Sequence, residues 1–169
     1  MSIPRAAAAG FALGLAWGVA ARVWMRLIST DPEFSWSGTG FILGSTAVCG
    51  LVFGALYGVR GAGRSRWWRL LALVCLVDFA GPGMVFIPAF LLGGLLWFGR
   101  NWSRSVGALA IAGGVVVLWL LNQGEPSGTN PVTTYGGFLL LSVTLSAGAA
   151  ELYRPRATQV HPRVAARVG

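Results

Sequence analysis

Long stretches of apolar residues, separated by short polar segments, constrain this chain more than any other feature. A helix that crosses a bilayer needs about 20 apolar residues, and each stretch is long enough for at least one crossing. Only 11% of the 169 residues are charged and 55% are hydrophobic, whereas a typical soluble domain has about 25% charged residues. We therefore expect an all-α, polytopic helical membrane bundle. The five stretches lie at about residues 3–28, 38–59, 67–98, 105–121 and 135–153.

The third stretch, residues 67–98, is interrupted by Gly81-Pro82-Gly83, a sequence that breaks a helix. If this stretch crossed the membrane once, the arginines would divide between the two sides with no proper bias. If the chain turns back at the break, only Arg22 and Arg26 lie on the side opposite the others. Cytoplasmic loops carry an excess of basic residues. We therefore predict four full spans plus a re-entrant or short two-helix hairpin, with both termini in the cytoplasm.

We expect one transmembrane domain over residues 1–153 and a flexible, basic cytoplasmic tail over residues 154–169. All 13 basic residues are arginines. Together with the many Ala, Gly, Val and Leu residues, this indicates a GC-rich bacterial genome and hence a bacterial inner membrane. The arginines flank the apolar stretches, so the net charge of +8 does not predict a nucleic-acid partner. We expect the first stretch to remain as a helix and not to be cleaved as a signal peptide.

The arms of the predicted hairpin are short. From Arg69 to Gly81 the chain covers about 18 Å as an α-helix, compared with about 30 Å for the hydrocarbon layer. Broken backbone at that depth is tolerated only where protein or a water-filled cavity surrounds it. The backbone groups of Gly81, Pro82 and Gly83 are therefore candidate ligands.

Asp78 is the first candidate among the side chains, because it lies about 14 Å along the arm from Arg69, close to the bilayer centre. A lone carboxylate at that depth costs at least about 2.5–3.5 kcal/mol, so Asp78 should be protonated or paired. Two interpretations remain open. Asp78 contacts an ion, a proton or a substrate, or it forms a capping or inter-helix hydrogen bond at the bend.

Arg22 and Arg26 are four residues apart and share one face of the first helix. Counted from Arg5, they lie about 25 Å and about 31 Å along that helix, near the outer interface. They either extend toward water as snorkelling side chains or form a cluster with Asp31 and Glu33 that binds an anionic headgroup or solute.

Glycines recur at every fourth position in the first two apolar stretches. This spacing places small residues on one face of a helix and allows close approach of a second helix. We expect these faces either to pack inside one bundle or to contact an identical subunit or a partner membrane protein. The glycines are Gly10, Gly14 and Gly18, then Gly50, Gly54 and Gly58.

The sequence predicts no cofactor, no metal and no catalytic residue. Cys49 and Cys75 lie inside apolar stretches, His161 is the single histidine, and lysine is absent. These residues do not supply the usual ligand spacing of a zinc site. Nucleophile elbows, phosphate loops and dinucleotide fingerprints are absent as well.

The function we predict is the binding or permeation of a small solute or ion. Its site would lie between the hairpin and the outer halves of the first two helices, with Asp78 as the ligand near the midplane. Two alternatives remain open. One is a non-catalytic accessory or assembly subunit of a larger membrane complex, and the other is an enzyme that acts on lipid headgroups through Asp31, Glu33 and the arginines.

Overall fold

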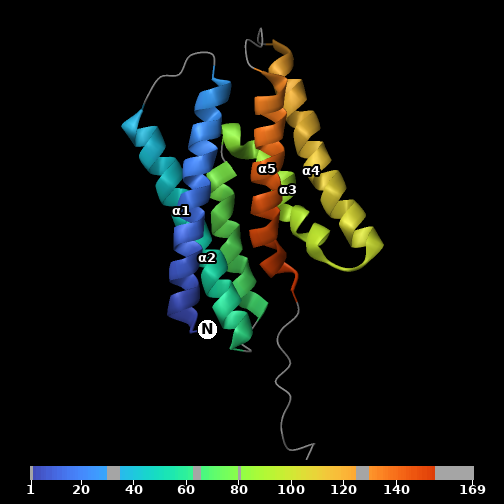
Figure 1. Cartoon of the computed structure of the whole chain (residues 1–169). Helices are drawn as coiled ribbons and strands as arrows, with labels where there is room; N and C mark the ends of the chain where they lie inside the picture. The colour runs from blue at the N-terminus through green and yellow to red at the C-terminus, as the bar shows by residue number, and fades with distance from the viewer. Residues whose placement is uncertain (1, 30–34, 63–65, 80, 125–129, 155–169) are drawn as a thin grey trace, which may run out of the picture.

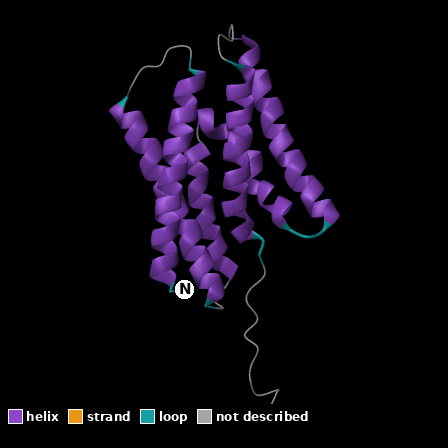
Figure 2. Cartoon of the chain, in the orientation of Figure 1, coloured by secondary structure: helices purple, strands orange, loops and turns teal. Residues whose placement is uncertain are grey.

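The structure of the protein is a computed structural model that describes residues 2–29, 35–62, 66–79, 81–124 and 130–154. Every regular element in these ranges is a helix (Figure 2). Four helices are long and apolar enough to cross a membrane, which confirms that part of the predicted fold and is compatible with a multi-pass membrane protein. They are α1 (Ile3–Ile28), α2 (Trp36–Gly61), α4 (Asn101–Leu121) and α5 (Pro131–Ala149). Short 3-10 helices, η4 (Asn122–Gly124) and η5 (Ala150–Leu152), follow α4 and α5.

Local sequence signals begin three of the long helices. Pro4 and Pro131 lie in the first turns of α1 and α5, where the missing N–H leaves no helical hydrogen bond unmade. At the start of α2, Oγ of Ser35 accepts a hydrogen bond from the N–H of Gly38 at 3.2 Å. Asn130 caps α5 in the same way. Such caps satisfy N–H groups that have no partner within the helix.

The third apolar stretch folds into four short helices: η1 (Arg66–Phe79), η2 (Gly81–Phe86), α3 (Ile87–Leu91) and η3 (Gly93–Trp97). η1 packs along α2, and the chain then turns back through η2 and α3 toward the start of α4 (Figure 1). This reversal of direction agrees with the predicted hairpin. Its re-entrant depth in a bilayer stays a prediction.

The first arm of this hairpin is a 3-10 helix, and not the α-helix that the sequence-based depth assumed. With three residues per turn, Ala72 and Cys75 fall on the same face, and both are buried. A 3-10 helix rises about 2.0 Å per residue, so the ten steps from Arg69 to Phe79 cover about 20 Å, compared with about 15 Å for the same residues as an α-helix. This part of the arm is therefore about two thirds as long as a hydrocarbon layer of about 30 Å is thick.

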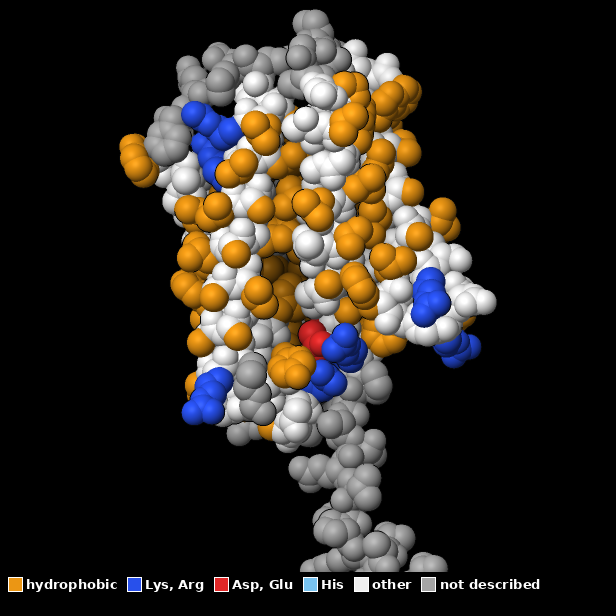
Figure 3. Space-filling view, in the orientation of Figure 1, with side chains coloured by type: hydrophobic (Ala, Val, Ile, Leu, Met, Phe, Trp, Pro, Cys, Tyr) orange, Lys and Arg blue, Asp and Glu red, His pale blue; other side chains and the backbone are white. Residues whose placement is uncertain are grey.

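Both ends of the described chain lie at the same end of the bundle, together with the α2–η1 connection and the start of α4 (Figure 1). Basic side chains gather at this end, and a smaller group lies at the opposite end beside the α1–α2 connection (Figure 3). On the face shown, hydrophobic side chains are spread over the surface between the two groups, and the side chains described there are uncharged. An apolar zone bordered by charge is the pattern that a bilayer requires.

The two rows of glycines face each other between α1 and α2. A Cβ atom on Gly10 would lie 2.2 Å from the carbonyl oxygen of Gly50, and one on Gly14 would lie 2.2 Å from that of Thr46. One on Gly54 would lie 2.2 Å from the carbonyl oxygen of Ala6. The expected packing inside one bundle is therefore present, and these faces pack against each other within the chain. A role for them in contacts with a second copy or a partner protein has no support in the structure.

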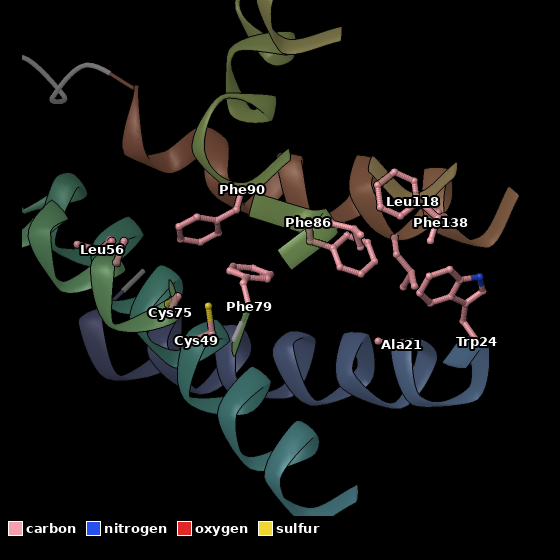
Figure 4. Close-up of a cluster of buried hydrophobic side chains, with 13 residues drawn as sticks. Ala21, Trp24, Cys49, Leu56, Cys75, Phe79, Phe86, Phe90, Leu118 and Phe138 are labelled. Atoms are coloured by element: carbon pink, nitrogen blue, oxygen red, sulfur yellow. The ribbon is translucent and has the colours of Figure 1, made fainter. Parts of the chain in front are cut away.

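Aromatic side chains form the centre of the bundle around α5. Phe138 of α5 is fully buried and stacks on Phe86, with ring centroids 5.0 Å apart, while the ring of Trp24 lies beside both (Figure 4). Phe79 and Phe90 form a second pair, with ring centroids 5.1 Å apart. These rings join α1, the hairpin and α5 into one core.

Three indole N–H groups bind α5, two from α1 and one from η3. Trp17 and Trp24 of α1 donate hydrogen bonds to backbone carbonyl oxygens of α5 at 3.1 to 3.2 Å. Trp97 of η3 donates to Oγ of Ser146 at 3.0 Å. Buried indoles usually find such a partner, and here the partners fix the position of the last long helix against the first.

Candidate functional site

A cavity of about 500 Å³ lies between α1, α2 and α5. Its lining runs along α1 from Ala6 to Trp17, along α2 from Thr46 to Tyr57 and along α5 from Thr144 to Gly148. Glu151 of η5 and Phe79 of η1 complete the wall. Figure 3 shows the hollow in the middle of the apolar face, above the red acidic side chain. Its volume falls within the range of about 300–1,000 Å³ that is typical of small-molecule sites.

The cavity is long in the direction of the helices. The lining segments of α1 and α2 each advance eleven residues, which corresponds to about 16 Å along an α-helix. One leaflet contributes about half of the hydrocarbon thickness of about 30 Å. The cavity is therefore about as long as one leaflet is deep, and it begins near the basic end of the bundle.

The inner part of the cavity wall is chemically apolar. Oγ1 of Thr46 donates to the carbonyl oxygen of Ile42 at 2.7 Å, and Oγ1 of Thr144 donates to that of Leu140 at 2.9 Å. Trp17 Nε1 donates to Oγ1 of Thr144 at 3.1 Å and so bridges α1 to α5 at the inner end. Because these polar groups bind one another or their own helices, the wall suits a hydrocarbon chain better than an ion.

The opposite end of the cavity, which we call the mouth, is charged. Glu151 lines it, and its side chain is 11% exposed. Oε2 of Glu151 lies 3.0 Å from Nε of Arg60, and Oε1 lies 2.8 Å from Nη1 of Arg154. The guanidinium of Arg60 also lies 5.2 Å from the ring centroid of Tyr57, a second lining residue. One carboxylate thus holds two arginines at the mouth.

Two further contacts fix the chain segment that carries these ion pairs. Nη2 of Arg69 in η1 donates to the carbonyl oxygen of Arg154, and the hydroxyl of Tyr153 donates to the carbonyl oxygen of Leu91 in α3. Burial raises the pKa of the Tyr153 phenol, which favours the protonated hydroxyl that donates this hydrogen bond. The mouth is therefore tied to both arms of the hairpin.

The outer residues predicted from the sequence are only partly within the described chain. Arg22 is half-buried, and its Nε donates to Oγ1 of Thr39 in the first turn of α2 at 3.1 Å. Arg26 lies one turn further along α1 and is also half-buried. Asp31 and Glu33 lie outside the described residues, so the predicted cluster of these four side chains stays a prediction.

The hairpin residues of the predicted site are described mainly through their backbone. Gly81, Pro82 and Gly83 lie in η2, and Gly83 is buried. Asp78 lies in η1, but its side chain is outside the described part of the structure. The neighbouring Phe79 lines the cavity, whereas the three turn residues are not among the lining residues that the structure describes. A ligand role for Asp78 and the three turn residues stays a prediction.

Sequence reasoning missed Glu151, the acidic residue at the mouth. It lies three residues before Arg154 near the end of an apolar stretch, where a carboxylate and a guanidinium on neighbouring turns can pair. That spacing was a usable signal. The partner Arg60 is 91 residues away in sequence, and no local pattern links the two.

Comparison with protein-family models, with curated proteins and with solved structures gives no match for this chain.

Proposed function

We propose that this protein is a multi-pass protein of a bacterial inner membrane, with both termini in the cytoplasm. We further propose that it binds an amphipathic molecule whose hydrocarbon chain enters the α1–α2–α5 cavity from the bilayer. The positive-inside rule supports the orientation, because the arginine-rich segments and both described chain ends lie at one end of the bundle.

The observation that carries the binding proposal is the combination of an apolar wall about 16 Å long with a single charged mouth. Of the described residues that line the cavity, Glu151 alone carries a charge. An amphipathic molecule has the same division between a long apolar part and a polar end. The wall packs the chain, and the mouth lies where the polar end meets the membrane surface.

A pair of glycines on α5 allows a matched test. Gly148 lines the cavity, and a Cβ atom there would meet nothing within 4 Å. A Gly148→Phe substitution therefore fills the cavity without a clash at Cβ. A Cβ on Gly136 also meets nothing within 4 Å, and Gly136 is not a lining residue, so Gly136→Phe is the control on the same helix.

The assay is photo-crosslinking of a fatty acid that carries a diazirine on its chain, with the protein in vesicles and the modified peptides identified by mass spectrometry. We expect crosslinks at the lining residue Leu145, and we expect Gly148→Phe to remove most of them. Crosslinks at Leu109, which is 70% exposed on α4, should not change in either variant. An unchanged yield at Leu145 in Gly148→Phe would refute the proposal.

Permeation of a small solute or ion at the hairpin is a second candidate. It is favoured by the reversal of the chain beside the cavity, where Phe79 lines the wall and Asp78 precedes it. Under this proposal, Asp78→Asn should abolish solute uptake into vesicles and leave fatty-acid crosslinking unchanged. Uptake at the wild-type rate in this variant would mean that Asp78 is not part of the site. The accessory-subunit and headgroup-enzyme alternatives stay predictions from the sequence.

A further inference from the structure

Resting on the proposed function, we infer that the ligand is an anionic phospholipid of the leaflet on the arginine-rich side. One acyl chain occupies the cavity, and the phosphate binds the guanidinium groups of Arg60 and Arg154 at the mouth. This inference names the class of ligand and the two residues that select it.

The polar end of the ligand must supply the selectivity, because the chain cannot. Lipid tails are as apolar as leucine side chains, so apolar groups inside a bilayer gain no hydrophobic driving force by moving onto protein. A chain therefore enters the cavity mainly through shape and packing. Every phospholipid in the bilayer offers such a chain, and a preference for one of them has to arise at the mouth.

The charges at the mouth favour an anion. The side chain of Glu151 is only 11% exposed, while those of Arg60 and Arg154 are 23% and 46% exposed. The carboxylate is thus the covered member of the group, and the guanidinium groups extend outward. Together the three side chains carry a net positive charge, and Arg69, which donates to the carbonyl oxygen of Arg154, adds another.

Guanidinium chemistry fits a phosphate at this position. Each guanidinium has five N–H donors, and Glu151 engages Nε of Arg60 and Nη1 of Arg154. The planar arrangement of the donors matches phosphate oxygens, and the charge-assisted hydrogen bonds are strong. Glu151 holds the two arginines at the mouth, where their other donors can bind a headgroup.

The geometry also places the phosphate at the membrane surface. The mouth residue Glu151 precedes Leu152, the last residue of the fourth apolar span. From there the cavity extends about 16 Å inward along α1 and α2, which is about one leaflet. A phospholipid that keeps its phosphate at the interface can therefore place one acyl chain along the cavity without leaving its own leaflet.

The test compares phosphatidylglycerol with phosphatidylcholine, both with palmitoyl and oleoyl chains, by native mass spectrometry of the full-length protein titrated with each lipid. We expect the wild-type protein to bind phosphatidylglycerol about tenfold more tightly. Arg60→Gln and Arg154→Gln should each remove most of this preference and weaken the binding of phosphatidylcholine much less, because the ammonium group of that lipid balances the charge of its phosphate. Arg154 is the more exposed of the two, so its variant remains informative if Arg60→Gln fails to fold.

Arg104→Gln is the matched control, because it removes the same charge from the exposed start of α4. If all three arginine variants lost the preference for phosphatidylglycerol equally, the preference would reflect a general attraction to net positive charge, and the inference would be overturned. Equal affinity of the wild-type protein for the two lipids would overturn it as well. Glycerol phosphate, which has the headgroup chemistry without a chain, should not compete. Competition by it would mean that the mouth takes a soluble phosphate instead of a lipid.

Gly148→Phe separates this inference from the proposed function. We expect this substitution to lower the affinity for both lipids to a similar extent, because the new ring obstructs the acyl chain and leaves the mouth intact. If it does so but the wild-type protein shows no preference, the chain site stands and the headgroup assignment fails. If the preference survives Gly148→Phe at full affinity and is lost in Arg60→Gln, the headgroup contact stands and the chain site fails.

Discussion

Gly50→Ala is expected to destabilise the protein by about 3 kcal/mol, because α1 and α2 cannot keep their separation around an added methyl group. The new Cβ atom would lie 2.2 Å from the carbonyl oxygen of Gly10 and 2.7 Å from Cα of Gly14. Ordinary van der Waals contact begins at 3.4 Å, so the helices must move apart by about 1.2 Å. The clashing atoms are backbone atoms and cannot rotate away.

The magnitude follows from two effects of that shift. Overpacking in a well-packed interface typically costs about 1–3 kcal/mol. A gap of about 0.5–1 Å forfeits a quarter to a half of the dispersion energy of each contact, and here the shift affects a whole helix pair. The higher helix propensity of alanine offsets about 0.5–1 kcal/mol.

Gly44→Ala on the same helix is the control, since a Cβ atom there meets nothing within 4 Å. We expect this variant to be as stable as the wild-type protein or slightly more stable. Both can be measured by unfolding in mixed dodecyl maltoside and SDS micelles, followed by far-ultraviolet circular dichroism. If Gly50→Ala and Gly44→Ala unfold at the same fraction of SDS, the close approach of α1 and α2 does not stabilise the fold and the reasoning is wrong.

Three further predictions concern the core and the topology. Gly137→Ala should destabilise the protein by about 2–3 kcal/mol in the same unfolding assay, because its Cβ would lie 2.1 Å from Cδ1 of Trp24; wild-type stability would mean that the indole can move. Ser142→Ala should be neutral or stabilising by up to about 1 kcal/mol, since the fully buried Oγ of Ser142 has no hydrogen-bond partner within the described structure; a clear loss of stability would indicate a partner. Single cysteines introduced by Arg64→Cys and Arg156→Cys, in a protein with Cys49 and Cys75 replaced by serine, should react with a membrane-impermeant maleimide from the same side of the membrane, and reaction from opposite sides would contradict the hairpin.

Helices that depend on local composition could be predicted closely from the sequence. The first apolar stretch was expected at residues 3–28, and α1 spans Ile3–Ile28. Proline and cap residues such as Asn130 explain why α5 begins at Pro131, a few residues before the apolar stretch. The glycine spacing in the first two stretches predicted faces that pack closely, because period four in a helix defines a face, but it did not identify α1 and α2 as partners; the structure shows that pairing.

Features that depend on several helices could not be predicted in the same way. The 3-10 geometry of η1 places Ala72 and Cys75 on one face. Residues three apart also share a face of an α-helix, so this spacing does not distinguish the two kinds of helix. The cavity exists only through the relative positions of α1, α2 and α5, which no single segment encodes. The pairing of Arg60 with Glu151 likewise depends on the completed bundle, so the sequence directed attention to Asp78 and the outer arginines instead.

The indole contacts between α1 and α5 impose an order on biosynthesis. The acceptors of Trp17 and Trp24 lie 109 to 127 residues further along the chain, which at about 5–20 residues per second corresponds to a delay of roughly 5–25 s. The α1–α2 pair can close early because the two helices are consecutive in the nascent chain, but Trp17 and Trp24 have none of these acceptors until α5 has been synthesised. A chain truncated before α5 would lack all of these acceptors, so α1 would carry two indole N–H groups without the partners they have in the complete bundle.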